Sequence, residues 1–467
     1  MLINGETIVG DSIVELTNPF DQSVIDTVSE GSPQHVERAV GAASDALAVM
    51  ADISAYERSR ILFSAYQELS RRAEEFATTI CQEVGKTIRE ARGEVQRATE
   101  VIQLSAEETK RFAGEQLPLD GASNGAGKIG FTMRVPAGVV AAIVPFNFPC
   151  VLTAHKLGPA LAAGNTVVLK PPPQAPTAAS MFAQLLNDAG FPPGAVNAVP
   201  GGAEVGDALV RDDRVRVVAF GGSDRTGEIV ARAAGLKKLL LECGSASSVT
   251  VMPTADIDAA LSACVRGGYT VAGQMCIHAQ KNFVHQDIYD DYLQQFINQV
   301  EKLKVGDPRR EDTDMGPVID EAAARRLDAW IAEAVQQGAQ IATGATRQAN
   351  LFAPTVITRV TPDMKLFKDE VFGPIVSIIP VRDVDEAIQL TNMTRYGLNS
   401  GIFTNVLSEG LAFVRGAQQG SVFVNEASTW RADIMPYGGV KRSGIGREGI
   451  KYAMDAMTEH KVVAIQT

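Results

Sequence analysis

The residue types best suited to covalent chemistry in this sequence are a cysteine, a glutamate and an asparagine. Cys276 ends the segment Gly273-Gln274-Met275-Cys276, after a helical stretch from Asp256 to about Tyr269. A thiolate is a strong nucleophile once its pKa falls below the free value of about 8.5. Most free cysteines, however, are small buried hydrophobes, so Cys276 by itself leaves both interpretations open. Glu242 and Asn147 each stand at or just after the end of a short apolar run.

These runs belong to a pattern in which β-branched segments alternate with helix-length segments between residues 139 and 243. The pattern is typical of a parallel sheet covered on both faces. The predicted strands are Val139–Val144, Thr166–Lys170, Ala195–Val199, Val215–Phe220 and Leu239–Glu242. Helices are predicted at about 150–163, 176–189, 203–211 and 225–235. A doubly wound fold of this kind binds ligands at the carboxyl ends of its strands, so the residues just after each strand matter most.

The segment from Gly222 to Gly227 lies at one of these strand ends and opens a predicted helix. Ser223 is a plausible N-cap, and the free N–H groups of a helix start suit a pyrophosphate. A glycine before a helix is also an ordinary turn, so contact with a ligand and a plain turn are both open. The Gly-x-Gly-x-x-Gly fingerprint of ordinary dinucleotide folds is missing.

The rest of the chain predicts three further parts. Residues 33–115 have the spacing of long amphipathic helices. The stretch Leu117–Arg134 is glycine-rich and ends in an alternating run, which indicates a protruding hairpin. A second α/β pattern follows from about 245 to 440, with strands expected at Ser248–Met252, Gln280–His285, Val371–Ile379, Gly401–Thr404 and Ser421–Asn425. The predicted class is therefore α/β, with two sheet domains and a small β arm.

Composition excludes several classes of protein. Of 467 residues, 43 are Lys or Arg and 55 are Asp or Glu, and the net charge of -12 argues against nucleic-acid binding. Apolar runs are far shorter than the roughly 20 residues of a membrane span, and the first residues lack a secretory signal, so we expect a cytoplasmic protein.

Cysteine and histidine spacing argues against disulfides and metal. The five cysteines (Cys81, Cys150, Cys243, Cys264 and Cys276) are an odd, widely spaced set, which is not a disulfide framework. The five histidines show no spacing that places two ligands on one helix face, so we predict no metal site.

Seven motifs in order along the chain together resemble the aldehyde dehydrogenase superfamily. They are Phe146-Asn147-Phe148-Pro149, Leu169-Lys170-Pro171, Phe220-Gly221-Gly222-Ser223, Glu242-Cys243-Gly244, Gly273-Gln274-Met275-Cys276, Glu370-Val371-Phe372-Gly373-Pro374 and Pro436-Tyr437-Gly438-Gly439-Val440-Lys441. Cys276 lies 34 positions after Glu242, and Lys170 lies 23 positions after Asn147, as in the family. The resemblance implies a Rossmann-like NAD(P)-binding domain (1–113 and 135–243), a catalytic domain (244–445) and an oligomerisation arm (114–134 and 446–467).

The resemblance also implies catalytic roles. Cys276 would attack the aldehyde as a thiolate, and the Asn147 amide with the Cys276 backbone N–H would meet the oxyanion of the thiohemiacetal. After hydride leaves for the nicotinamide, Glu242 would activate the water that hydrolyses the thioester. The plain alternatives are a surface carboxylate for Glu242 and a turn residue for Asn147.

The cofactor residues implied by the resemblance lie on both sheet domains. They are Phe146, Lys170, Gly222, Ser223, Gly227, Cys243, Glu370 and Phe372, with Lys170 and Glu370 on the two riboses and Phe372 packed against the cofactor. Where many NAD-preferring members carry a glutamate three residues after the lysine, this chain has Pro173, so repulsion of a 2′-phosphate is missing. We therefore expect NADP to be accepted alongside NAD. Cys243 and Ser245 also replace the residues usual in the family, leucine and glycine.

Substrate preference follows from a branch of the superfamily. The chain looks most like the lactaldehyde, sulfolactaldehyde, phosphonoacetaldehyde and non-phosphorylating glyceraldehyde-3-phosphate dehydrogenases. Members that bind anionic aldehydes use arginines matching Arg97 and Arg431, and a third immediately before the nucleophile, where this chain has Met275. A small hydroxylated or singly anionic aldehyde is therefore expected, with His155 as a further pocket candidate. Arg97 and Arg431 could equally be surface ion-pair partners, and His155 a core residue.

Three other functions remain open at this stage. A CoA-acylating dehydrogenase would release its thioester to coenzyme A, although such members generally lack the base at Glu242. A succinate-semialdehyde or aromatic aldehyde dehydrogenase has the same fold, and a non-catalytic protein could keep the architecture. The hairpin and the apolar Val462–Ile465 run resemble the family's oligomerisation arm, which implies a homodimer or homotetramer.

Overall fold

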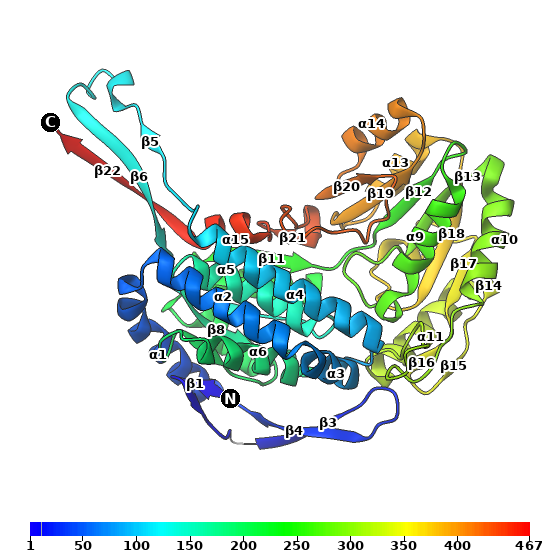
Figure 1. Cartoon of the computed structure of the whole chain (residues 1–467). Helices are drawn as coiled ribbons and strands as arrows, with labels where there is room; N and C mark the ends of the chain where they lie inside the picture. The colour runs from blue at the N-terminus through cyan, green and yellow to red at the C-terminus, as the bar shows by residue number, and fades with distance from the viewer. Residues whose placement is uncertain (11) are drawn as a thin grey trace.

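An eight-stranded sheet forms the larger of two lobes in the computed structural model, which describes residues 1–10 and 12–467 (Figure 1). The strand order is β2-β1-β9-β8-β7-β10-β11-β21. The five neighbours β9, β8, β7, β10 and β11 run parallel to one another. The bounds are β1 (Leu2–Ile3), β2 (Glu6–Thr7), β7 (Val139–Ile143), β8 (Thr166–Lys170), β9 (Val196–Ala198), β10 (Val215–Gly222), β11 (Lys238–Cys243) and β21 (Gly444–Ile445). The chain moves outward from β7 to β9 and returns to β10 beside β7, so the switch point lies between β7 and β10.

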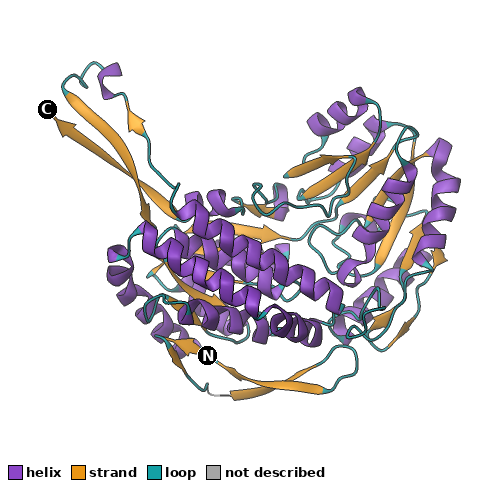
Figure 2. Ribbon diagram, viewed as in Figure 1, coloured by secondary structure: helices purple, strands orange, loops and turns teal. Residues whose placement is uncertain are grey.

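Alternate residues of the central strands pack on two helical layers, because successive side chains of a strand point to opposite faces. Val140 and Ala142 face one core cluster, while Val139 and Ala141 face another. The first layer is α2 (Ala55–Arg71), α3 (Ala73–Val84), α4 (Ile88–Thr109), α5 (Pro149–Ala162), α6 (Pro176–Asp188) and α15 (Ile450–Ala456). The second is α1 (Pro33–Asp52), α7 (Ala203–Arg211) and α8 (Asp224–Ala234). Figure 2 shows helices on both sides of this sheet. The doubly wound prediction is confirmed.

The start of α5 is fixed by a buried ion pair from the long helices. Glu94 accepts hydrogen bonds from the backbone N–H groups of Cys150 (2.8 Å) and Val151 (3.2 Å), which α5 cannot pair within itself. Lys86 binds Glu94 at 2.6 Å and lies 3.7 Å above the ring of Phe148. The ion pair therefore holds in place the turn that carries Asn147, just before α5.

The smaller lobe contains a seven-stranded sheet of order β14-β17-β18-β13-β12-β19-β20, parallel except for β14. The strands are β12 (Ser248–Val251), β13 (Lys281–His285), β14 (Gln340–Thr343), β17 (Thr355–Thr358), β18 (Ile375–Val381), β19 (Asn399–Phe403) and β20 (Ser421–Val424). The helices are α9 (Ile257–Tyr269), α10 (Tyr289–Val300), α11 (Glu321–Gln336), α12 (Lys365–Lys368), α13 (Val384–Asn392) and α14 (Leu407–Gly416). A small ribbon pairs β15 (Arg347–Gln348) with β16 (Leu351–Phe352).

The predicted second sheet was incomplete in two respects. Strands β14 and β17 were not predicted, and the predicted start of β18 at Val371 was four residues too early. The backbone at Phe372 has φ of 45°, a left-handed conformation that a strand cannot contain. Residues 371–374 are therefore a loop that leads into β18.

Three strands form an arm that projects from the larger lobe (Figure 1). They are β5 (Gln116–Leu117), β6 (Lys128–Pro136) and β22 (Thr458–Gln466), in the antiparallel order β22-β6-β5. The predicted hairpin is confirmed. The C-terminal range assigned to the arm, 446–467, was too long: α15 packs on α5 and α4, because Ile450, Ala453 and Met454 belong to the core of the larger lobe.

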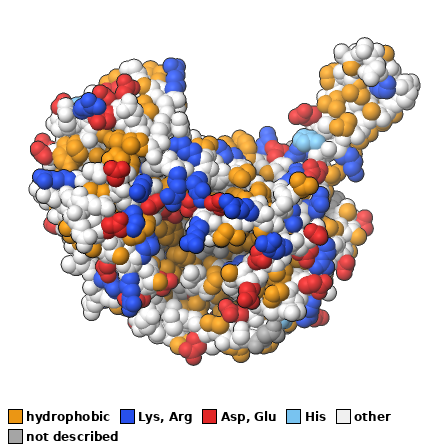
Figure 3. Space-filling model, turned by 180° about the vertical axis from the view of Figure 1, so that it is seen from behind, with side chains coloured by type: hydrophobic (Ala, Val, Ile, Leu, Met, Phe, Trp, Pro, Cys, Tyr) orange, Lys and Arg blue, Asp and Glu red, His pale blue; other side chains and the backbone are white. Residues whose placement is uncertain are grey.

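A further contact joins the lobes. The hairpin of β3 (Ser12–Thr17) and β4 (Val24–Glu30) runs along the larger lobe towards the smaller one (Figure 1), where Asn350 donates to the carbonyl of Pro19 at 2.9 Å. On the opposite face, lysine and arginine side chains gather where the lobes meet (Figure 3).

Within residues 1–10 and 12–467, no helix has the length and apolar character needed to span a bilayer.

Candidate active site

The loop that carries Cys276 has an unusual backbone. α9 ends at Tyr269, and Val271, Ala272 and Gly273 then follow with φ of 52°, 50° and 70°. Such values are rare for a β-branched residue and persist only where the surroundings impose them. A side chain at position 273 would place its Cβ 2.1 Å from the carbonyl oxygen of Gly373, so this position requires glycine.

Side chains of the larger lobe hold this loop. Glu90, in the first turn of α4, accepts a hydrogen bond from the N–H of Val271 at 2.8 Å. Asn147 donates its side-chain amide to the carbonyl of Gln274 at 2.9 Å. Within the smaller lobe, the side-chain carbonyl oxygen of Gln274 accepts a hydrogen bond from the N–H of Ile319 at 2.9 Å. The cysteine therefore sits on a loop of one lobe whose position is set partly by the other.

Cys276 and Glu242 meet at the hydroxyl of Tyr437. The Tyr437 oxygen lies 3.0 Å from Cys276 Sγ and 3.4 Å from Glu242 Oε1. Glu242 is the penultimate residue of β11 and is 5% exposed, and Tyr437 is fully buried. Burial and then the negative charge of Glu242 raise the pKa of the Cys276 thiol. Burial, followed by the charge of Glu448, raises the pKa of Glu242.

The residues predicted for cofactor binding come from both lobes. Phe146 follows β7, and its ring meets that of Phe372 at 5.9 Å in an edge-to-face contact. Ser223 caps α8, where its hydroxyl accepts from the N–H of Thr226 at 3.2 Å. A side chain at Gly227 would lie 2.5 Å from Cys243 Sγ, so Cys243 packs under α8, and burial raises the pKa of its thiol to about 12.

Two buried charged groups among these residues fit a dinucleotide. Lys170 ends β8 with 7% exposure, and its ammonium group donates to the adjoining carbonyl of Pro171 at 3.2 Å. Burial lowers its pKa to about 8, opposed by the charge of Glu30. Glu370 accepts from the N–H of Ser245 at 3.1 Å, and burial raises its pKa to about 8. A donor and an acceptor with spare hydrogen-bonding capacity suit ribose hydroxyls. Gly222 lies at the end of β10, where it pairs with Cys243 of β11.

The four residues predicted for substrate binding form one cluster beside Tyr437. Arg97 makes two hydrogen bonds to Asp433, at 2.7 and 3.1 Å, and His155 Nε2 lies 2.9 Å from the same carboxylate. The Arg431 guanidinium lies 3.8 Å from the Tyr437 ring centre. Met275 packs against the group formed by Ile277, Leu398 and Tyr437.

Arg431 has three partners besides the ring, one of which is Asp433, whose Oδ1 lies 3.4 Å from Arg431 Nε. Its Nη2 atom lies 2.9 Å from His155 Nε2 and 3.3 Å from Glu448 Oε2, and Glu448 also binds Lys156 at 2.8 Å. Because arginine only donates and carboxylate only accepts, His155 Nε2 can satisfy either Arg431 or Asp433 but not both. Burial and Arg431 lower the pKa of His155, so the ring is neutral and donates to Asp433.

Several residues of this site were missed by sequence reasoning. Tyr437 stood inside a quoted motif without a role, and Asp433 was given none. Glu90, Lys156 and Glu30 gave no signal because their contacts join distant segments. Ser245, noted only as a departure from the family, donates its hydroxyl to the carbonyl of Cys276.

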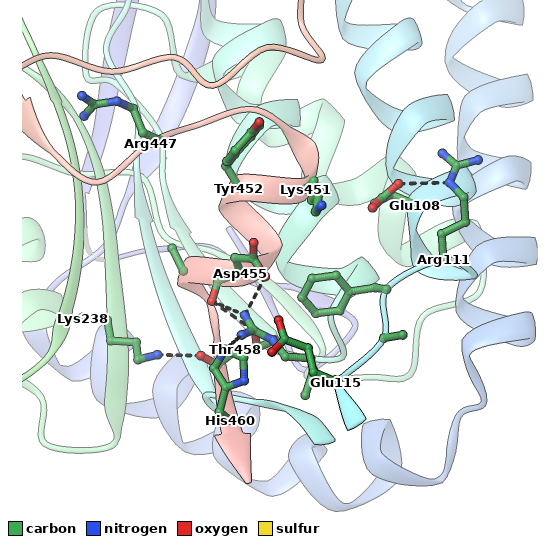
Figure 4. A pocket seen from close by; sticks show the side chains of 14 residues that line it. Glu108, Arg111, Glu115, Lys238, Arg447, Lys451, Tyr452, Asp455, Thr458 and His460 are labelled. Atoms are coloured by element: carbon green, nitrogen blue, oxygen red, sulfur yellow. Dashed lines mark hydrogen bonds and ion pairs between the residues drawn. The ribbon is translucent and has the colours of Figure 1, made fainter. Parts of the chain in front are cut away.

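A cavity of about 850 Å³ lies elsewhere, at the base of the arm (Figure 4). It is lined by residues such as Arg111, Lys238, Tyr452 and Asp455, and by none of the predicted site residues. Lys238 donates across it to the carbonyl of Thr458 at 2.5 Å. The residues that line this cavity include no cysteine.

Comparison with known proteins agrees with this geometry. The model of the aldehyde dehydrogenase family matches residues 8–463. The 3-sulfolactaldehyde dehydrogenase of Priestia aryabhattai is 43% identical over 466 residues, which cover 100% of this chain and 97% of that protein. The chain belongs to the aldehyde dehydrogenase family. It is therefore an NAD(P)-dependent oxidoreductase that acts on the aldehyde group.

Two solved structures are similar along nearly their whole length. Glyceraldehyde-3-phosphate dehydrogenase from Methanocaldococcus jannaschii, complexed with NADP, superposes with a TM-score of 0.94 at 35% identity, covering 97% of this chain and 99% of that one. Aldehyde dehydrogenase 21 from Physcomitrella patens, in complex with succinate, gives 0.97 at 37% identity, covering 100% and 97%.

Removal of the Glu90 carboxylate tests how the nucleophile loop is held. We expect Glu90→Ala to leave the buried N–H of Val271 unpaired, at a cost of about 1–3 kcal/mol. The loop around Cys276 should then exchange its amide hydrogens faster, and kcat should fall by about tenfold. Glu100→Ala, an exposed carboxylate on the same helix, is the control and should change neither quantity. Unchanged exchange at residues 270–276 in Glu90→Ala would contradict the anchoring role.

Proposed function

We propose that this protein oxidises a small hydroxylated or singly anionic aldehyde to its carboxylate with NAD or NADP. Cys276 is the nucleophile, Glu242 the base and Asn147 an oxyanion donor in this proposal. The observation that supports it is that Cys276 Sγ and Glu242 Oε1 both lie within hydrogen-bonding distance of the Tyr437 hydroxyl, at 3.0 and 3.4 Å. A thiol beside a buried carboxylate is suited to forming and then hydrolysing a thioester.

The protein's own residues support each stage of that reaction. Loss of the Cys276 proton needs a base, because burial and Glu242 raise the thiol's pKa. Attack on the carbonyl carbon then gives a tetrahedral thiohemiacetal. The second amide hydrogen of Asn147 and the Cys276 N–H would stabilise its oxyanion, since one Asn147 hydrogen is already bound to Gln274. The bound nicotinamide supplies the hydride acceptor. Glu242 finally takes a proton from the water that hydrolyses the thioester.

The division of labour between the lobes is also proposed. Residues 1–113 and 135–243 would bind the cofactor, with the switch point between β7 and β10 beside Phe146, Gly222 and Ser223. Residues 244–445 would supply the nucleophile and Glu370. Five unpaired cysteines fit a reducing compartment, so we place the enzyme in the cytoplasm.

The charge of the cluster around Asp433 supports an anionic or hydroxylated substrate. Three cations (Arg97, Lys156 and Arg431) face two carboxylates (Asp433 and Glu448), so the cluster itself, without the neighbouring Glu242, carries one positive charge in excess. A singly charged group on the aldehyde would balance it, whereas a phosphate would bring too much charge. The sulfolactaldehyde specificity of the Priestia relative and the succinate in the Physcomitrella structure agree with this class.

Free acid formation separates the proposed reaction from its alternatives. We expect reduction of NAD or NADP with lactaldehyde, glycolaldehyde or succinate semialdehyde, and release of the acid without coenzyme A. Cys276→Ser should abolish it, because an alcohol is a far weaker nucleophile at neutral pH. A requirement for coenzyme A would indicate an acylating enzyme, and no turnover with any of these aldehydes would leave only the non-catalytic alternative.

Arg431→Gln tests the substrate class within the same assay. We expect KM for succinate semialdehyde to rise by about tenfold or more, since a hydrogen bond between charged groups contributes about 1.5–3 kcal/mol. KM for lactaldehyde should change less. Arg325→Gln, on the exposed face of α11, is the matched control. Equal changes for the charged and neutral aldehydes would remove Arg431 from substrate binding.

Cofactor choice is tested at Pro173, which is exposed beside Glu30 near Lys170. Pro173→Glu should lower kcat/KM for NADP relative to NAD by about tenfold, because a new carboxylate repels a 2′-phosphate. Pro173→Gln is the neutral control. Raising the pH through about 8 deprotonates Lys170, so kcat/KM for NADP should fall more steeply than that for NAD. A wild-type preference for NAD above about a hundredfold would contradict this proposal.

We also propose that the arm joins two copies of the chain in a homodimer, or two such dimers in a homotetramer. Ile129, Met133 and Ile465 on one face of the arm and Val462 on the other are 46–63% exposed, and exposed apolar side chains on a strand pair normally find a partner. Light scattering should give at least a dimeric mass, and Val462→Glu with Ile465→Glu should lower it. Lys461→Glu, on the same strand, is the control. A monomeric wild type at micromolar concentration would refute the assembly.

A further inference from the structure

Tyr437 is held rigidly at the centre of the site. Its backbone N–H donates to the Glu448 carbonyl at 3.0 Å, and the Glu448 N–H donates back to the Tyr437 carbonyl at 2.7 Å. The ring packs against Ile277 and Leu398 and lies under the Arg431 guanidinium at 3.8 Å. Both the chain and the ring are therefore fixed, and the hydroxyl has one position.

That hydroxyl contacts both reacting groups, which also lie within hydrogen-bonding reach of each other. It lies 3.0 Å from Cys276 Sγ and 3.4 Å from Glu242 Oε1. A tyrosine hydroxyl can accept one hydrogen bond while it donates another. The thiol can therefore donate to the Tyr437 oxygen at the same time as the Tyr437 O–H donates to the carboxylate.

We propose that Tyr437 is a further catalytic residue, which passes the proton of the Cys276 thiol to Glu242. This step rests on the function proposed above. The S–H bond of Cys276 breaks as the Tyr437 oxygen takes its proton, and the original Tyr437 O–H proton moves to Glu242 Oε1. A thiolate and a carboxylic acid result, tyrosine ends neutral, and no oxidant or reductant is needed. The new Tyr437 O–H then donates to the thiolate.

The electrostatics of the surrounding residues agree with a neutral carrier. Burial, together with Cys276 and Glu242, raises the pKa of Tyr437 well above its usual range, so the hydroxyl keeps a proton at neutral pH. The charged groups that face the three residues are Glu370 from the loop before β18, Arg431 and Glu448 from the C-terminal segment, and Lys156 from α5. They remain unchanged when only the hydroxyl is removed.

Alkylation of Cys276 by iodoacetamide tests the step without aldehyde or cofactor. The rate at Cys276, followed by peptide mass spectrometry, should rise with pH as the thiolate forms. In Tyr437→Phe this rise should move up by about one to two pH units, because the thiolate loses a hydrogen bond. Tyr292→Phe removes a buried hydroxyl from α10 of the same lobe and should leave the profile unchanged. Coinciding profiles for wild type and Tyr437→Phe would overturn the proposal.

A second measurement distinguishes a carrier from a packing residue. In single-turnover formation of reduced nicotinamide, Tyr437→Phe and Glu242→Gln should each slow the rate by about tenfold or more. The double variant should be no slower than the slower single variant. If the two groups act in series on one proton, removing either of them already abolishes the transfer. If the rate losses of the two single variants multiply in the double variant, the proposal is wrong. An enzyme that oxidises no aldehyde would refute the proposed function, whereas the alkylation shift would still decide the role of Tyr437.

Discussion

The site depends on hydrogen bonds that cross between the two lobes. Cys276 belongs to the smaller lobe, but its loop is held by Glu90 and Asn147 of the larger one. The left-handed residues Val271 and Ala272 are strained, and the strain persists only while those bonds are made. Any relative movement of the lobes would therefore move the thiol away from Glu242, which is the penultimate residue of a strand of the larger lobe.

Burial gives the site its reactivity and also sets its main requirement. Burial raises the pKa of both the thiol and the carboxylate, so the thiol does not ionise readily in isolation. A path for the proton between them is needed for the thiolate to form at neutral pH. The buried cations nearby, Arg431 and Lys156, are paired with carboxylates, and this pairing makes their burial tolerable.

Sequence reasoning predicted what depends on local pattern. The parallel strands of the larger lobe, the long helices and the arm hairpin all carry strong periodicity, and the structure confirms them. It failed where tertiary contacts decide. The loop at Phe372 has the composition of a strand but a left-handed backbone, and α15 lies in the core although its neighbours in sequence form the arm. Tyr437, Asp433 and Glu90 act through partners more than 150 residues away, a relation that no local pattern contains.

Asn147 illustrates why single roles are too simple for this site. One of its amide hydrogens binds the Gln274 carbonyl, two residues before the nucleophile. A residue that both positions the loop and stabilises an oxyanion couples binding geometry to charge stabilisation. Loss of the amide would misplace Cys276 as well as weaken the oxyanion site, so its effect would exceed that of either function separately. In the proposed mechanism, the Lys86–Glu94 pair would therefore contribute indirectly, because it fixes the turn that carries Asn147.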